Sequence, residues 1–233
     1  MKIAAYIFFG VFISGIFLSC KKDNYSSPQS QLTGTLMYNS DTVHVEYNRV
    51  PFQLYQYGFG KVGPIEGTFS QDGMLDALLF NGDYKLIIPN GQGPFLWKQT
   101  ALGAPDSLAI TMGGNQNINI EVTPYYMIRN AQISGSGSSV SATFQVEKII
   151  TDANAKDIES VSLFISKTKF VSGTDNIART DLAGSDITDP NDISLTVSVP
   201  SISPAQNYVF ARIGLKIASV EDMIFSPLVT ITY

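Results

Sequence analysis

The sequence predicts an all-β protein with two β-sandwich domains behind a lipoprotein signal peptide. Short alternating segments recur along the chain and are separated by glycine, asparagine, aspartate and proline, which is typical of β-sandwiches. No stretch after residue 20 sustains the i, i+3, i+4, i+7 apolar spacing of a long amphipathic helix. Removing residues 1–19 from the 233-residue chain leaves 214 residues, enough for two domains of about 100 residues each.

Residues 1–19 have the layout of a secretory signal peptide. Lys2 precedes an uncharged apolar run from Ile3 to Leu18, and the small Ser19 follows it. A membrane-spanning helix needs about 20 apolar residues, so this run is marginal as an anchor. We therefore expect residues 1–19 to be removed on export.

Cys20, the only cysteine, stands directly after this run. The segment Leu18-Ser19-Cys20 resembles the lipobox of bacterial lipoproteins, although Phe17 stands where leucine is more common. The resemblance implies that Cys20 becomes the first mature residue and carries a lipid that binds the membrane. The alternative is an ordinary cleaved signal with an incidental cysteine. Residues 20–30, rich in asparagine, serine and proline, then form a flexible tether.

Charge and cysteine content exclude several classes of function. The formal net charge of −5 becomes −6 once Lys2 is removed, so the protein is not built to bind nucleic acid. With Cys20 lipidated, no thiol remains for a disulfide framework or a cysteine metal site. We expect no cofactor and no metal.

The first half, residues 31–123, reads as one β domain. Asp72-Gly73 and Asn81-Gly82 supply the positive φ that tight turns require. The expected strands are 32–37, 51–56, 67–70, 82–89 and 117–122.

The second half, residues 124–233, reads as an immunoglobulin- or fibronectin-like sandwich. Its segments "SVSATFQVEKI" and "ISLTVSVP" alternate cleanly, as strands with one solvated face do. Pro124 cannot donate to a central ladder, so we take "VTPYY" as the domain boundary. The expected strands are 127–134, 140–148, 160–167, 193–199, 208–218 and 227–233.

Several motifs in order resemble a Bacteroidota family of two-domain lipoproteins of unknown function. They are "KKDNYSSPQSQLTGTL", "QDGML", "LFNGDYKLIIPNGQGPF", "VTPYYMIRNAQI" and "VFARIGLKIASVEDMIFSPLV". The family is often encoded beside SusC/SusD-type outer-membrane glycan importers. The resemblance implies a carboxypeptidase-regulatory-like (prealbumin-like) domain followed by an immunoglobulin-like one, and a lipid anchor in the outer membrane on either its periplasmic or its surface face. It brings no catalytic residues, and "YNSDTVHVEYNRVPF" departs from the "TG.P" turn common in such first domains.

The sequence offers little for catalysis. His44, the only histidine, lies in the alternating segment "DTVHVEY", and we expect a solvated strand residue there rather than a general base. The carboxylates are scattered over turn-like segments such as "TDANAKD", where aspartate caps or starts turns. We therefore expect no catalytic residues, and a glycoside hydrolase is the least favoured class.

Candidate contact residues gather in the segment "NGQGPFLWKQT". Its glycines and proline predict a loop that exposes Phe95 and Trp97 for a sugar face, with Gln92 and Lys98 nearby as hydrogen-bonding groups. The alternative places Trp97 in the end of the first sandwich or at the domain junction. Tyr57 lies in a second aromatic row, "QLYQYGFG", which is either a surface platform or a core face.

The leading expectation is a non-catalytic outer-membrane lipoprotein, accessory to glycan or nutrient capture with a SusC/SusD-type importer. A structural or protein–protein interaction module of a cell-envelope assembly is the alternative, because immunoglobulin-like domains present edges and loops to partners.

Overall fold

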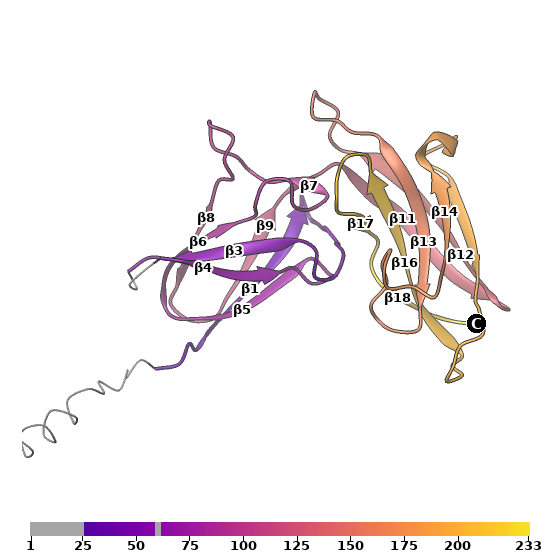
Figure 1. Cartoon of the computed structure of the whole chain (residues 1–233), viewed down its shortest axis with the longest axis horizontal. Coiled ribbons are helices and arrows are strands. Elements are labelled where there is room, and N and C mark those ends of the chain that lie inside the picture. The colour runs from indigo at the N-terminus through magenta and orange to yellow at the C-terminus, as the bar shows by residue number, and fades with distance from the viewer. Residues whose placement is uncertain (1–25, 59–61) are drawn as a thin grey trace, which may run out of the picture.

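The computed structural model describes residues 26–58 and 62–233, and it is composed of β-strands and short connections (Figure 1). The expected signal peptide, Cys20 and Phe59 lie outside these residues. Within the described residues, no helix is long and apolar enough to cross a membrane. The all-β architecture of two β-sandwich domains is confirmed.

The first domain contains two sheets. In one sheet, β1 (Ser30–Tyr38) lies between an antiparallel β5 (Met74–Leu79) and a parallel β9 (Gln116–Glu121), and its end pairs with β2 (Asp41–Thr42). The other sheet has the order β4 (Pro64–Thr68), β3 (Pro51–Gln56), β6 (Gly82–Ile87) and β8 (Leu108–Met112). Alternate residues of β1, β3 and β6 point inward and are buried, so the expected period of two positions the core.

A two-stranded ribbon connects this sandwich to the second domain. β7 (Phe95–Leu96) pairs with β10 (Thr123–Pro124), and Pro124 lies opposite Phe95. Proline is tolerated here because the ribbon is short and has free edges. Pro124, the residue at which we placed the domain boundary, is therefore paired with the first half of the chain.

The second domain is a seven-strand sandwich with an eighth short strand. One sheet contains β11 (Tyr126–Ser136), β12 (Ser139–Lys148) and β15 (Ile193–Ser198). The other contains β14 (Ala178–Ala183), β13 (Ile158–Ser166) and β16 (Tyr208–Ile217), with β17 (Ile224–Phe225) and β18 (Val229–Thr232) both paired to β16. Such strands, divided between two packed sheets, form the expected immunoglobulin/fibronectin-like sandwich.

Three strands longer than two residues were not expected from the sequence, nor were the two-residue strands β2, β7, β10 and β17, and one edge strand is shifted. β5, β8 and β14 were not expected, and the strand expected at 67–70 begins earlier, at Pro64. β14 reads "ARTDLA" and has no fully buried residue, so it lacks the apolar alternation that indicates a strand. β4 is an edge strand with almost every side chain exposed, and its position depends on pairing with β3 rather than on burial.

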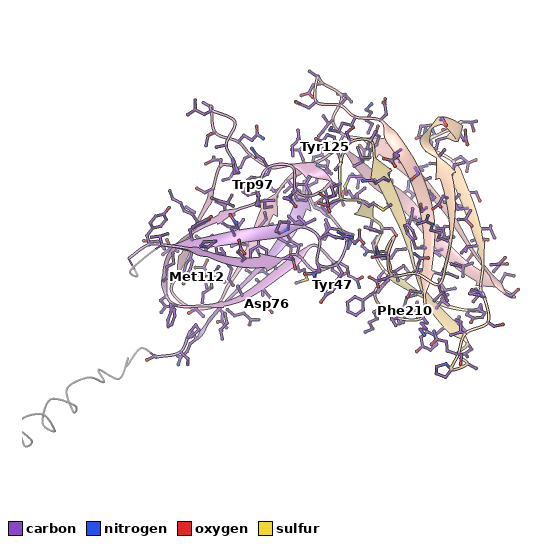
Figure 2. All side chains as sticks on the ribbon, viewed as in Figure 1. Tyr47, Asp76, Trp97, Met112, Tyr125 and Phe210 are labelled. Carbon is purple, nitrogen blue, oxygen red and sulfur yellow. The ribbon has the colours of Figure 1, made fainter. Side chains whose placement is uncertain are left out.

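The two domains are joined through a packed junction. One hydrophobic cluster contains residues of both sandwiches, including Tyr125 and Tyr126, and Tyr125 lies between the two domains (Figure 2). The backbone N–H of Phe225 donates to the carbonyl of His44 across this junction, at 3.1 Å. The side chain of Gln71 donates to the carbonyl of Lys169, at 3.0 Å. These contacts hold the domains as one unit.

Arg212 lies at the centre of the junction and is completely buried. Its guanidinium donates to the carbonyls of Ser226, Val45 and Gln71, at 3.0, 3.3 and 3.1 Å, and lies 4.5 Å from the ring centroid of Phe225. Burial lowers the pKa of Arg212 to about 10, and the guanidinium stays charged at neutral pH. The carbonyls of Val45 and Gln71 belong to the first domain and that of Ser226 to the second, so the Arg212 side chain is hydrogen-bonded to both domains.

His44 lies beside this arginine and is not the solvated strand residue that the sequence suggested. Its side chain is mostly buried at the junction, with Nδ1 4.0 Å from Asp72 Oδ1. Burial, and to a smaller extent the positive charge of Arg212, lower the pKa of His44 to about 4. The imidazole is therefore neutral at physiological pH, and its expected role as a solvated residue is wrong.

Candidate functional site

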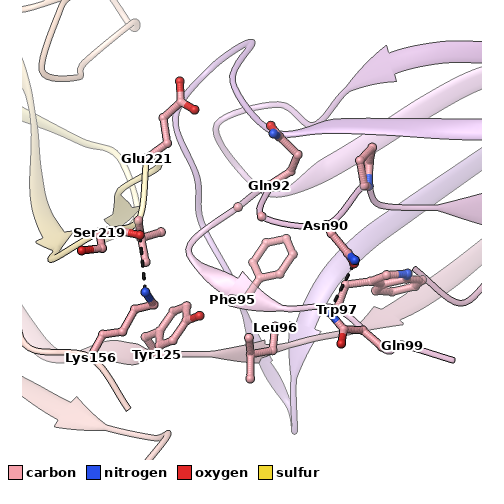
Figure 3. A pocket seen from close by; sticks show the side chains of 14 residues that line it. Asn90, Gln92, Phe95, Leu96, Trp97, Gln99, Tyr125, Lys156, Ser219 and Glu221 are labelled. Carbon is pink, nitrogen blue, oxygen red and sulfur yellow. Dashed lines mark hydrogen bonds between the residues drawn. The ribbon is translucent and has the colours of Figure 1, made fainter. Parts of the chain in front are cut away.

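A hollow opens at the domain junction, beside the loop that follows β6 (Figure 3). Its volume is about 190 Å³. The loop from Pro89 to Gln99 forms one wall, and the turn Ser219–Glu221 between β16 and β17 forms the other, with Tyr125 and Lys156 beneath. Residues from both domains are therefore needed to build it.

Phe95 forms part of the floor because Gly93 leaves room for its ring. The φ of Gly93 is +82°, which favours glycine, and a Cβ there would lie 2.5 Å from Phe95 Cζ. The N–H of Gly93 donates to Asp222 Oδ2 at 2.7 Å. Asp222 is 4% exposed, and burial raises the pKa of its carboxyl above the usual range. This hydrogen bond fixes the loop of the first domain to the turn of the second.

The floor and the rim differ in chemistry. Phe95, Leu96 and Val220 supply apolar surface, whereas Tyr125, Gln92 and Glu221 supply polar groups. Figure 3 shows the hydroxyl of Tyr125 directed toward Phe95. Such a pairing of apolar floor and polar rim is the usual form of a small-molecule site.

Several of the polar groups have no partner within the part of the chain that the structure describes. The hydroxyl of Tyr125, the amide of Gln92 and the carboxylate of Glu221 make no hydrogen bond to any described residue. Burial raises the pKa of Tyr125, so its hydroxyl stays protonated and can donate. The ammonium of Lys156 donates only a long bond, 3.4 Å, to the carbonyl of Ser219. The hollow therefore presents free donors and acceptors to a ligand.

The structure separates the residues that the sequence proposed as contacts. Gln92, Phe95 and Trp97 line the hollow. Lys98 does not line it, because its ammonium donates to the carbonyl of Ser107 at 2.6 Å and lies 5.4 Å from the ring centroid of Trp97.

Phe95 and Trp97 are not exposed on a surface loop, as one of the two sequence alternatives proposed. Their exposed fractions are 4% and 8%, and Trp97 Nε1 donates to the carbonyl of Asp106 at 2.7 Å. The glycines of the loop turn the chain back onto the sandwich instead of lifting the rings into solvent. Both rings are therefore largely buried where they line the hollow.

Tyr57 lies apart from the hollow. It follows Gln56, the last residue of β3, which pairs with Tyr84 near the beginning of β6, whereas the loop of the hollow follows the end of β6. Its ring is 54% exposed and lies 5.6 Å from the ammonium of Lys85. The sequence left open whether this aromatic row is a surface platform or a core face, and Tyr57 lies on the surface.

Sequence reasoning missed the contribution of the second domain. Tyr125 was read only as a boundary residue, Lys156 only as part of the turn-like segment "TDANAKD", and Glu221 only as part of a segment that carries the family resemblance. Only the adjacent tyrosines 125 and 126, at a domain boundary, could have signalled a junction site. Among the described residues, no cluster of three or more histidine, cysteine, aspartate or glutamate side chains could hold a metal ion.

Comparison with curated protein sequences finds no match. Three solved structures are similar along nearly the whole chain. A DUF3823 family protein from Parabacteroides merdae is 31% identical, with a TM-score of 0.76 over 89% of this chain and 100% of that one. One from Bacteroides ovatus is 27% identical, with a TM-score of 0.74 over 88% and 99%. A candidate carbohydrate-binding protein from Bacteroides uniformis is 15% identical, with a TM-score of 0.65 over 88% and 100%, which indicates a shared fold.

Two family models match the chain in succession. The N-terminal domain of DUF3823, described as a protein of unknown function, matches residues 30–123. The model DUF3823_C, described as a domain of unknown function, matches residues 126–230. Together with the likeness to the Parabacteroides merdae protein, these matches show that the chain belongs to the DUF3823 family.

Proposed function

We propose that this protein is a non-catalytic, lipid-anchored accessory of the outer membrane that captures glycans for a SusC/SusD-type importer. The lipid is carried by Cys20, and the glycan binds in the hollow at the domain junction. The proposal joins the lipobox-like segment Leu18-Ser19-Cys20 to the chemistry of that hollow.

The observation that carries the proposal is the set of free polar groups above an apolar floor. A sugar has hydroxyl groups that donate and accept, and C–H faces that favour apolar contact. Tyr125, Gln92 and Glu221 supply matching groups, and Phe95 and Leu96 supply the apolar contact. Because the ring of Phe95 is largely buried, hydrogen bonds to the rim carry most of the selectivity.

The position of the hollow accords with capture by an anchored protein. The described chain enters β1 at the end of the first domain remote from the second domain, whereas the hollow lies at the junction (Figure 1). A tether ahead of Ser30 therefore leaves the hollow accessible. The Bacteroides uniformis protein, which shares the fold, is described as a candidate carbohydrate-binding protein, and this description also supports a carbohydrate ligand.

The carboxylates of the hollow support a binding role rather than hydrolysis. Most glycoside hydrolases use a pair of carboxyl groups on either side of the scissile bond. Glu221 is the one carboxylate among the described residues that line the hollow, and Asp222 beside it is buried and bonded to Gly93. His44, the only histidine, lies elsewhere in the junction.

The direct test is binding to a glycan array by the soluble protein from residue 26 onward. Tyr125→Phe removes one free hydroxyl and keeps the ring, and we expect it to weaken binding about fivefold, the value of one hydrogen bond of about 1 kcal/mol. Tyr208→Phe is the matched control, because Tyr208 is exposed at the start of β16, away from the hollow. No binding to any glycan, or equal losses in both variants, would contradict the proposal.

An interaction module is the second candidate, and one observation favours it. Tyr47 of the first domain and Phe170 of the second are both exposed, and their ring centroids are 4.7 Å apart. Exposed aromatic pairs are common at the centre of protein interfaces. Pull-down of envelope proteins by the wild type, lost in Tyr47→Ser with glycan binding intact, would favour this role.

A further inference from the structure

A second hollow lies on the outer face of the sheet formed by β14, β13 and β16. Its volume is about 400 Å³. Phe164 and Met223 give it an apolar part, while Ser160, Arg179 and Asp181 give it a polar part. None of these residues belongs to the wall of the junction hollow.

The polar part is an ordered arrangement. Ser162 donates to Asp181 Oδ1 at 2.6 Å, and Arg179 Nε lies 3.1 Å from Asp181 Oδ2. Both oxygens of the Asp181 carboxylate thus contact protein groups. The carboxylate and the Arg179 guanidinium, two residues apart on β14, are held next to each other. The hydroxyl of Ser160 makes no hydrogen bond to a described residue, so it is free to bind a ligand.

The two hollows are adjacent because the same two chain segments build both. Lys156 lines the junction hollow, and Glu159 and Ser160 line the sheet-face hollow. On the neighbouring strand, Lys216 lines the sheet-face hollow and pairs with Ser160, while Val220 lines the junction hollow.

A rigid turn separates the hollows. The ammonium of Lys216 donates to the carbonyls of Val220 and Glu221, the latter at 2.7 Å. Asp222 in the same turn is fixed to Gly93. The turn is therefore held in place, and its residues Glu221 and Met223 line the junction hollow and the sheet-face hollow respectively.

The distance between the two hollows and the charges of the side chains that line them indicate which ligand would fit both. At about 3.3 Å per extended residue, the four steps from Lys156 to Ser160 cover up to roughly 13 Å, a span that suits a short oligosaccharide better than a single sugar ring. The ionisable side chains that line the two hollows balance, with Lys156, Arg179 and Lys216 against Glu159, Asp181 and Glu221. Balanced charge favours a neutral ligand over an anionic one.

We propose that the two hollows form one groove for a neutral oligosaccharide, with one end in the junction hollow and the following rings on the sheet face. This inference rests on the proposed capture of glycans and adds the length and charge of the ligand. A monosaccharide fills only the junction hollow and binds weakly. Each further ring adds contacts until the sheet-face hollow is full.

The test is calorimetric titration with neutral oligosaccharides of one to six rings, taken from the malto-, cello-, xylo- and manno-series. We expect affinity in at least one series to rise tenfold or more from the monosaccharide to the tetrasaccharide and then to level off. Ser160→Ala should weaken binding of the long chains about fivefold, the value of one hydrogen bond, and leave the monosaccharide unchanged. Ser194→Ala, on the exposed face of β15 in the opposite sheet, is the matched control.

The possible failures are distinguishable. If no saccharide of any length binds, both the glycan proposal and the groove are wrong. If saccharides bind through Tyr125 with an affinity independent of length, or if Ser160→Ala and Ser194→Ala behave alike, the junction site stands and the groove is wrong. If charged oligosaccharides bind more tightly than neutral ones of equal length, the assignment of a neutral ligand is wrong.

Discussion

The backbone N–H of Gly93 in the first domain donates to the buried carboxylate of Asp222 in the second domain, at 2.7 Å. The bond joins the two walls of the junction hollow. The two residues are 129 positions apart in the sequence, so no local sequence pattern predicts the bond. The shape of the hollow therefore depends on how the domains are held together.

Removing this carboxylate should loosen both the hollow and the junction. Asp222→Ala leaves the Gly93 N–H without its partner in a buried place, and we expect a loss of about 1–3 kcal/mol in the free energy of unfolding. Asp222→Asn keeps an accepting oxygen and should lose less. Urea unfolding measures both, with Asp192→Ala in an exposed loop as the control. Equal stability of Asp222→Ala and the control would show that the bond contributes nothing.

Arg212 should determine whether the domains unfold together. Arg212→Met keeps an apolar stem but removes the guanidinium hydrogen bonds to three carbonyls, two of them in the first domain. At about 1 kcal/mol for each bond, we expect a loss of roughly 3 kcal/mol. We expect one cooperative transition in the wild type and two in the variant, because each domain has its own pair of sheets. Calorimetry resolves this, and an unsplit transition in the variant would contradict it.

His44 should make stability depend on pH between about 6.5 and 4. The pKa of His44 is lowered to about 4, so in this window the unfolded chain binds a proton that the folded protein does not. The free energy of unfolding therefore falls as pH falls through the window, by about 3 kcal/mol in all, and the effect ends below pH 4.

His44→Gln isolates this effect from the carboxylates that titrate in the same range. We expect the difference in stability between wild type and variant to favour the variant increasingly from pH 7 to pH 4. A difference that stays constant with pH would mean that the imidazole is not buried as described.

Trp97 should behave as a core residue. Its side chain is 8% exposed and its indole N–H is bonded, so Trp97→Ala should cost about 3–5 kcal/mol of stability. Trp97→Phe, which loses only the hydrogen bond and part of the ring, should cost much less. Thermal melting measures this loss. An unchanged melting temperature for Trp97→Ala would mean that Trp97 is exposed on the surface.

Cys20 should be the membrane anchor. If the lipid on Cys20 provides the attachment, Cys20→Ala should move the protein from the membrane fraction to the soluble fraction. Ser27→Ala, in the expected tether, serves as the control. A Cys20→Ala protein that remains in membranes after a carbonate wash would indicate that the apolar run of residues 3–18 is itself the anchor.

The sequence by itself determined the class of fold, because alternation is a local consequence of strand geometry. Strands such as β3 and β12 alternate between buried and exposed side chains, so their period is visible in the chain. Asp72-Gly73 likewise announced a turn, and Gly73 has φ of +70°. Strands without this pattern, such as β14, could not be recognised, because pairing with β13 and not burial defines them.

The tertiary structure alone decided the site. The glycines around Phe95 and Trp97 indicated a loop, but whether a loop lies against the protein or in solvent depends on contacts with distant residues such as Asp106 and Asp222. The pKa of His44 depends in the same way on Arg212, which lies 168 residues away. The burial of these side chains and the electrostatics around them arise only when the two domains pack together. The alternation of residues along a strand therefore cannot predict them.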